Sequence, residues 1–169
     1  LLMAPWPRRL PRHANVVWTA YPTLTADFAG LPLLPLFLSC RAAVRAKTSV
    51  TAANLQAEQP RMSELQNYAR DYLTMAQRLL QPPPACLVAI GGFSGSGKST
   101  LAKALAPLIG AVPGAVVLRS DETRKRLCGA DPFHGLGPDG YTAGVTRRVY
   151  DALARHAAQV IRSGHAAVV

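Results

Sequence analysis

The residues best suited to chemistry lie in one glycine-rich stretch. Residues 92–99 read Gly-Phe-Ser-Gly-Ser-Gly-Lys-Ser and fill every fixed position of the pattern G-x-x-x-x-G-K-[S/T]. Glycines allow backbone conformations that are closed to other residues and a close approach to a ligand, so that successive N–H groups can surround an anion. We therefore expect a nucleotide phosphate site formed by Gly92, Ser94, Gly95, Ser96, Gly97, Lys98, Ser99 and Thr100.

Two side chains of this stretch have specific predicted roles. Lys98 is expected to reach the β- and γ-phosphates of a nucleoside triphosphate, and the hydroxyl of Ser99 is expected to bind a metal ion, Mg²⁺. The implied cofactors are ATP and Mg²⁺. The alternative is a glycine-rich turn in which Lys-Ser occurs by accident.

The elements around the stretch support the phosphate-binding prediction. Residues 86–90 are a short apolar run without helical periodicity, which is typical of a buried parallel strand. Apolar residues at helical spacing follow, so a helix is expected from Lys98 to near Ile109. The glycines would then lie at a strand-to-helix turn, where the helix dipole also favours an anion.

A second candidate group follows the next apolar run, residues 115–118. Ligands of open parallel sheets bind at the carboxyl ends of the strands, which would bring residues 119–124 beside the glycine-rich stretch. Asp121 could then accept a proton from an attacking hydroxyl, and Arg124, one helical turn later, could hold a phosphate. Alternatively, Ser120 or Asp121 caps a short helix at 121–127 and Arg124 is solvated; capping and catalysis are also compatible.

The remaining pattern predicts an α/β fold after an all-helical segment. A long helix is expected at 141–163 and a third strand at 166–169, which gives a parallel sheet with flanking helices. Upstream, a short helix at 13–18 should end at Tyr21-Pro22, and longer helices are expected at 33–55 and 61–80. His156 and His165 read as ordinary helix-surface and turn residues.

Composition limits the classes of partner. The 169 residues are 49% hydrophobic and have a formal net charge of +10, which favours anionic ligands. The basic residues are scattered, so nucleic acid is a less favoured partner than a nucleotide. Three widely spaced cysteines, expected to be buried, argue for a reducing compartment, and no apolar stretch is long enough to span a membrane. We expect a cytoplasmic protein.

Several stretches resemble a bacterial family of bifunctional proteins in which an aminoglycoside-phosphotransferase-like domain precedes a P-loop kinase domain of the zeta-toxin and polynucleotide-kinase type. The resemblance lies in residues 87–100, 117–121 and 124–127, and residues 33–47 are similar to the last helices of the phosphotransferase-like domain. It implies that residues 1–81 are a helical C-terminal piece of that domain, 82–85 a proline linker and 86–169 the N-terminal part of the kinase domain.

The resemblance also implies an activity. The intact protein would transfer the γ-phosphoryl group of Mg·ATP to a hydroxyl of a small molecule, with Lys98, Asp121 and Arg124 in catalysis. The aspartate expected after the third strand and the arginines of a lid would fall beyond Val169, so this chain alone is expected to be an inactive internal fragment with an incomplete sheet. Two other functions stay open: a polynucleotide 5′-kinase, or an ATP-binding module that senses nucleotide without catalysis.

Overall fold

The centre of the protein is a small parallel sheet. The computed structural model describes residues 11–25, 27–131 and 134–169. Its strands β1 (Leu87–Val88), β2 (Val116–Val117) and β3 (Ala167–Val168) are arranged in the order β1-β3-β2. Ala167 of β3 pairs with Leu87 on one side and with Val116 on the other, both in parallel. The predicted α/β arrangement with a parallel sheet is confirmed.

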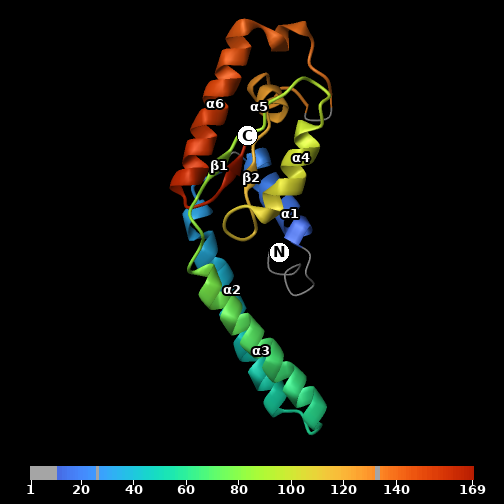
Figure 1. Cartoon of the computed structure of the whole chain (residues 1–169), viewed down its shortest axis with the longest axis vertical. Helices are drawn as coiled ribbons and strands as arrows, with labels where there is room; N and C mark the ends of the chain where they lie inside the picture. The colour runs from blue at the N-terminus through green and yellow to red at the C-terminus, as the bar shows by residue number, and fades with distance from the viewer. Residues whose placement is uncertain (1–10, 26, 132–133) are drawn as a thin grey trace.

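Helices cover both faces of this sheet. Val116, Leu118 and Ala167 pack against α6 (Ala143–Arg162), whereas the alternate strand residues face α4 (Lys98–Leu105). Figure 1 shows α6 and α4 on opposite sides of the strands. This alternation follows from the two-residue period of a strand, and it explains why β2 and β3 are apolar on both faces.

The N-terminal helix is longer than expected. Helix α1 (Pro11–Thr25) continues through Pro22, so the predicted end at Tyr21-Pro22 is wrong. A proline inside a helix removes one backbone hydrogen bond, but Pro22 is almost completely buried and its packing keeps the chain in place. The hydroxyl of Thr23 also donates to the Thr19 carbonyl at 2.8 Å within the same turn.

Helix α1 is attached to the sheet by buried polar contacts. The amide of Asn15 donates to the carbonyls of Pro113 and Ala115 at 3.1 and 3.0 Å, and the Trp18 indole donates to Gly114 at 3.1 Å. Trp18 also belongs to the same apolar core as β2 and α6. The described part of the N-terminal segment therefore shares a core with the sheet, while a boundary at 82–85 stays a prediction.

Two antiparallel helices project from this body as a hairpin. A 3-10 turn, η1 (Leu31–Leu33), leads into α2 (Leu34–Asn54), and α3 (Gln59–Leu79) returns along it, close to the predicted helices at 33–55 and 61–80. Small side chains let the two backbones approach closely along a buried seam of Ala42, Ala46, Ala53, Ala69 and Ala76. None of the described helices is both long enough and apolar enough to cross a membrane.

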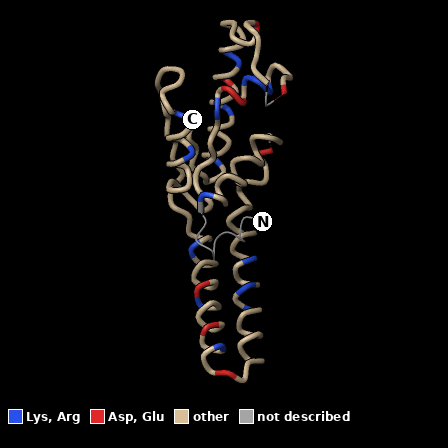
Figure 2. The backbone as a smooth tube through the Cα atoms, turned by 90° about the vertical axis from the view of Figure 1, so that its right-hand side faces the viewer, with Lys and Arg blue, Asp and Glu red and all other residues tan. Residues whose placement is uncertain are grey.

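Charge is distributed unevenly over the hairpin. Helix α2 contains Arg41, Arg45 and Lys47 but no acidic residue, whereas α3 contains side chains of both signs. Figure 2 shows this difference between the two helices. The prediction of buried cysteines is wrong, because Cys40, Cys86 and Cys128 are all exposed.

Candidate functional site

The glycine-rich stretch joins the end of β1 to the start of α4. Gly97 is the N-cap of α4 and has a φ of 81°, in the left-handed region that favours glycine. A Cβ on Gly97 would meet no atom of the described residues within 4 Å, whereas a Cβ on Gly92 would meet the Ser96 hydroxyl at 3.0 Å. The loop is exposed at the positive end of a helix dipole, which suits it to hold an anion.

Lys98 and Ser99 begin α4 directly behind this turn. Both are partly buried, and the ammonium group of Lys98 donates to the carbonyl of Phe93 on the opposite side of the loop. This hydrogen bond places the positive charge of Lys98 next to the Phe93 carbonyl, on the far side of the loop from the start of α4. A magnesium–triphosphate group requires N–H donors, a positive charge and a hydroxyl ligand for the metal. The glycine turn, Lys98 and Ser99 can provide these three in turn.

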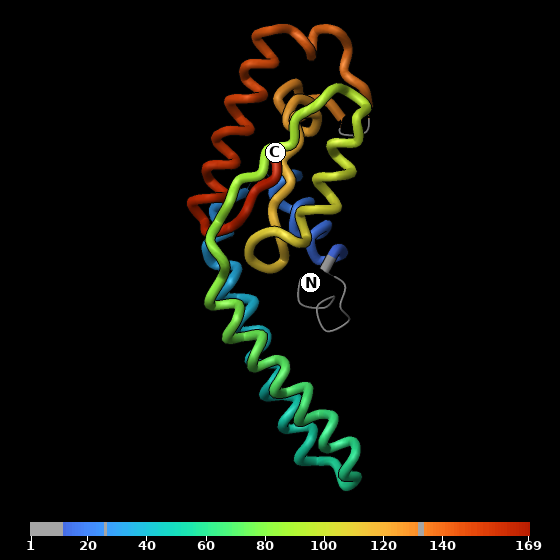
Figure 3. Tube along the Cα trace, viewed as in Figure 1, coloured from blue at the N-terminus to red at the C-terminus, as the bar shows by residue number. Residues whose placement is uncertain are grey.

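A pocket of about 100 Å³ connects this loop with the second candidate group. Lys98 and Ser99 line one wall, and Asp121 lines another together with the last residues of β2. In Figure 3 the chain ends (label C) just below α5 (Ser120–Leu127), with α4 to the right. The structure thus brings together two stretches that are more than twenty positions apart in the sequence.

Asp121 lies in the first turn of α5 at the edge of the pocket. Its side chain is 46% exposed, and one carboxylate oxygen is 3.5 Å from the ammonium nitrogen of Lys125. Arg119 is the N-cap residue, and within the described part of the chain no side-chain hydrogen bond caps this helix. The alternative in which Ser120 or Asp121 is present only as a helix cap is therefore wrong, and the carboxylate remains accessible from the pocket.

Arg124 has a different environment from the one expected. Arg124 is only 8% exposed. Its guanidinium donates to the Gly140 carbonyl at 2.8 Å and to the Thr146 hydroxyl at 3.2 Å. The same group lies 4.9 Å from the ring centre of Tyr141. The alternative in which Arg124 is solvated is wrong. These contacts tie α5 to η3 (Pro138–Tyr141) and to the start of α6, and Arg124 does not line the pocket. Phosphate binding by Arg124 stays a prediction.

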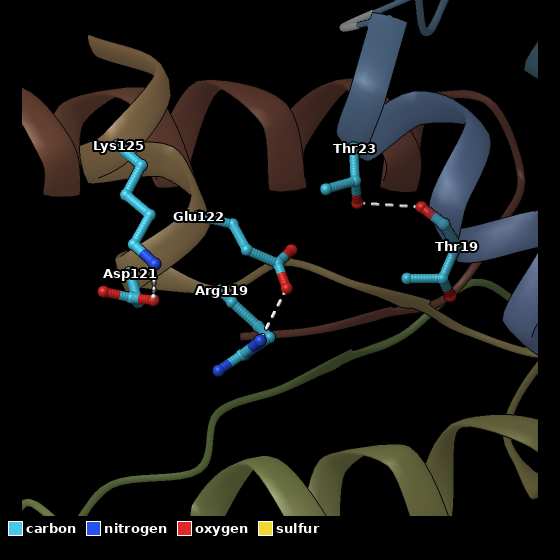
Figure 4. Close-up of polar contacts among 6 residues, drawn as sticks. All are labelled: Thr19, Thr23, Arg119, Asp121, Glu122 and Lys125. Carbon is cyan, nitrogen blue, oxygen red and sulfur yellow. Dashed lines mark hydrogen bonds and ion pairs between the residues drawn. The ribbon is translucent and has the colours of Figure 1, made fainter. Parts of the chain in front are cut away.

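The sequence placed Arg119 beside the glycine-rich stretch with residues 120–124 but gave this arginine no role of its own. It borders the pocket beside Asp121 and forms an ion pair of 2.6 Å with Glu122. Figure 4 shows Arg119 and Asp121 projecting from the start of α5, with Glu122 beside the guanidinium. Its position directly after a buried strand was the available signal, because that is the edge where ligands of parallel sheets bind.

A family comparison agrees with this geometry. Residues 87–169 match the family model described as an AAA domain, and this family belongs to the P-loop NTPases. These residues form a P-loop NTPase domain. The predicted phosphate-binding motif, residues 92–99, lies near the start of the matched P-loop domain, in the strand-to-helix turn that the sequence predicted.

Three curated relatives match a longer stretch than the P-loop domain. They are uncharacterized proteins of Mycobacterium bovis and of two strains of Mycobacterium tuberculosis, each 32% identical over 155 residues. The match covers 88% of this chain and therefore includes helices before the P-loop domain, but it covers only 29% of each relative's length. No solved structure matches the chain significantly.

Two histidines outside the P-loop motif are buried to different degrees. His165 is fully buried next to β3, with Nε2 3.0 Å from the Leu31 carbonyl oxygen, and its ring lies 5.1 Å from that of Trp18. Burial lowers the pKa of His165, against the opposite effect of the Leu31 hydrogen bond. His156 is partly buried and stacks on Phe28 at 4.8 Å. The expectation that both are ordinary surface or turn residues is wrong.

Proposed function

We propose that the P-loop domain binds Mg·ATP and that the intact protein transfers the γ-phosphoryl group to a hydroxyl group of a small molecule. The observation that carries this proposal is the pocket between α4 and α5, because it is lined by Lys98 and Ser99 from the phosphate loop and by Asp121 from the facing element. A phosphate-binding wall opposite a partly exposed carboxylate is the arrangement that phosphoryl transfer to a hydroxyl requires.

Each residue has one role in the proposed reaction. The loop of Gly92, Ser94, Gly95, Ser96 and Gly97, with Thr100, surrounds the phosphates through backbone N–H groups, and Lys98 neutralises the β- and γ-phosphates. Ser99 provides a hydroxyl ligand for Mg²⁺, which supplies charge stabilisation on the phosphate oxygens when bound. The bond between the γ-phosphorus and the β–γ bridging oxygen breaks, and a bond from the acceptor oxygen to that phosphorus forms.

Asp121 is the group that receives the acceptor's proton in this proposal. The hydroxyl proton moves to the carboxylate, so the products are ADP and a phosphate monoester. The Asp121 carboxylate is 46% exposed and lines the pocket together with Lys98 and Ser99, so an acceptor hydroxyl in the pocket can reach it.

The domain division is part of the same proposal. We take residues 1–81 as the C-terminal piece of a phosphotransferase-like domain, 82–85 as a linker and 86–169 as the first part of the kinase domain. The relatives support a longer protein, because the matched stretch is 29% of their length and extends upstream of the P-loop domain. Residues 1–10 lie outside the described residues.

Titration calorimetry of the chain with ATP and Mg²⁺ tests nucleotide binding. Lys98→Ala should weaken ATP binding by about 10- to 100-fold, the range expected when one charge-assisted contact is lost. Lys103→Ala is the matched control: it removes the same charge from the last turn of α4, and Lys103 does not line the pocket. Equal ATP affinity in wild type and Lys98→Ala would contradict the site.

Asp121→Asn tests catalysis separately from binding. The amide keeps the size of the side chain but cannot accept the proton, so ATP affinity should be unchanged and ADP formation by the intact protein should fall by about 100-fold or more. Unchanged ADP formation would exclude Asp121 as the base. Tight ATP binding with no ADP formation in the wild-type protein would favour a nucleotide sensor over a kinase.

A further inference from the structure

Two arginines of α5, one at its N-cap and one in its last turn, differ in what their guanidinium groups contact. Arg124 is held by Gly140, Thr146 and the ring of Tyr141, so it would have to abandon three contacts to reach a ligand. Among the described residues Arg119 has one such partner, Glu122, and its side chain is 30% exposed. Of these two arginines, only Arg119 lines the pocket that contains Lys98 and Ser99.

The position of Arg119 follows from local structure. The residue comes directly after β2 and is the N-cap of α5, with extended backbone angles, and its carbonyl accepts the N–H of Thr123 at 3.0 Å. Its main chain is therefore fixed by the helix start, at the carboxyl edge of the sheet. The side chain is then restrained by the Glu122 carboxylate one turn later.

The ion pair leaves the guanidinium able to bind an anion. The contact with Glu122 is made through Nη1, and a guanidinium carries further N–H donors on Nη2 and Nε in a rigid fork. In Figure 4, Arg119 extends away from α5 on the same side as Asp121, toward the chain segments drawn below it. The Arg119 guanidinium thus lies between the Asp121 carboxylate and the loop that contains Lys98. Its parallel N–H donors match the spacing of two oxygens of a phosphoryl group.

We propose that Arg119 binds the γ-phosphoryl group of the nucleotide from the side of the pocket opposite Lys98. This inference rests on the proposed function, since it assigns one more contact to the same nucleotide. Arg119 neutralises charge on the group that is transferred, while Glu122 positions the guanidinium. In this proposal the contacts of Arg124 hold η3 and α6 against α5, and its predicted phosphate contact is the alternative to be tested.

The proposal predicts that Arg119 distinguishes ATP from ADP, because ADP has no γ-phosphate. In calorimetric titrations with Mg²⁺, Arg119→Ala should weaken ATP binding by about tenfold or more and leave ADP binding unchanged. Arg119→Lys should recover part of the ATP affinity, because it keeps the charge but not the planar fork.

One matched control and one competing variant lie on the same helix. Arg126→Ala removes an equal charge from α5 outside the pocket and should keep the ATP-to-ADP affinity ratio. Arg124→Ala should lower the melting temperature, because buried contacts are lost, and should also keep this ratio.

The results separate this inference from the proposed function. Normal ATP affinity in Arg119→Ala would overturn the inference, and if Lys98→Ala still lost ATP binding, the nucleotide site would stand. Equal weakening of ATP and ADP by Arg119→Ala would also overturn it, because the contact would not be with the γ-phosphate. A loss of ATP preference in Arg124→Ala but not in Arg119→Ala would assign the γ-phosphate contact to Arg124 instead. Absence of nucleotide binding in the wild-type chain would overturn both this inference and the proposed function.

Discussion

The phosphate loop and the turn at residues 110–114 both depend on glycine in a positive-φ conformation, but for different reasons. Gly97 has a φ of 81° and open space where a Cβ would lie. Gly114 has a φ of 110°, and a Cβ there would lie 2.5 Å from the Ala106 carbonyl oxygen and 2.7 Å from the Asn15 amide nitrogen. The first glycine borders open space, whereas the second lets three segments of the protein pack together.

Both turns contain glycines with positive φ, but we expect the turn at 110–114 to matter for stability and the phosphate loop to matter for ligand binding. Backbone carbonyls of the turn at 110–114 accept hydrogen bonds from the Asn15 and Trp18 side chains of α1. The shape of the turn therefore decides whether α1 can pack on the sheet. The phosphate loop has no comparable side chain packed on it among the described residues. Substitutions in the turn at 110–114 should therefore lower the free energy of unfolding, whereas substitutions in the phosphate loop should mainly weaken ATP binding.

The largest effect on stability is expected for Gly114→Ala. The new methyl group would clash with backbone atoms of Ala106 and Pro107 and would occupy a strained conformation, so the free energy of unfolding should fall by about 3 kcal/mol or more. Chemical denaturation followed by circular dichroism measures this change.

The matched substitution in the phosphate loop is Gly97→Ala. It should cost only the backbone strain of about 1–2 kcal/mol, because a Cβ has open space there, and it should weaken ATP binding. If Gly97→Ala destabilised the protein as much as Gly114→Ala, the distinction between the two turns would be wrong.

A smaller effect is expected for Asn15→Ala. The substitution leaves the carbonyls of Pro113 and Ala115 without their amide donor in a buried place, so the free energy of unfolding should fall by about 2 kcal/mol. Asn67→Ala, on the exposed face of α3, is the control and should change stability by less than about 0.5 kcal/mol. An equally small change for Asn15→Ala would mean that α1 is not anchored through this turn.

The smallest effect concerns pH. Burial lowers the pKa of His165 in the folded protein, so the unfolded chain binds more protons as the pH falls below the ordinary histidine pKa of about 6.5. Stability should therefore be complete above that pH and decrease below it. His156 contributes with the same sign, because burial first, and then Arg126 and Arg155, lower its pKa.

Unfolding free energies measured between about pH 8 and pH 5 test this prediction around the ordinary histidine pKa. The decrease at low pH should be reduced in His165→Gln and reduced further when His156→Gln is added. An unchanged slope in the double variant would assign the acid sensitivity to other groups.

Local patterns were sufficient wherever structure depends on neighbours in the chain. The strand before the glycines, the helix that starts at Lys98 and the two long helices of the hairpin follow from apolar periodicity, proline and glycine. The end of α1 was mispredicted because Pro22 is kept in the helix by burial, which no local rule contains. The exposure of the cysteines was missed for the same reason, since burial depends on what packs against an element.

The sequence by itself determined the phosphate-binding motif, the α/β pattern and the position of Asp121 after a strand, because each depends on residue type and short spacing. Only the tertiary structure decided which arginine faces the pocket and which one is buried against Gly140, and that His165 and Asn15 connect the N-terminal segment to the sheet. The physical reason is that long-range hydrogen bonds and burial select among equivalent side chains, and these contacts join residues far apart in the chain.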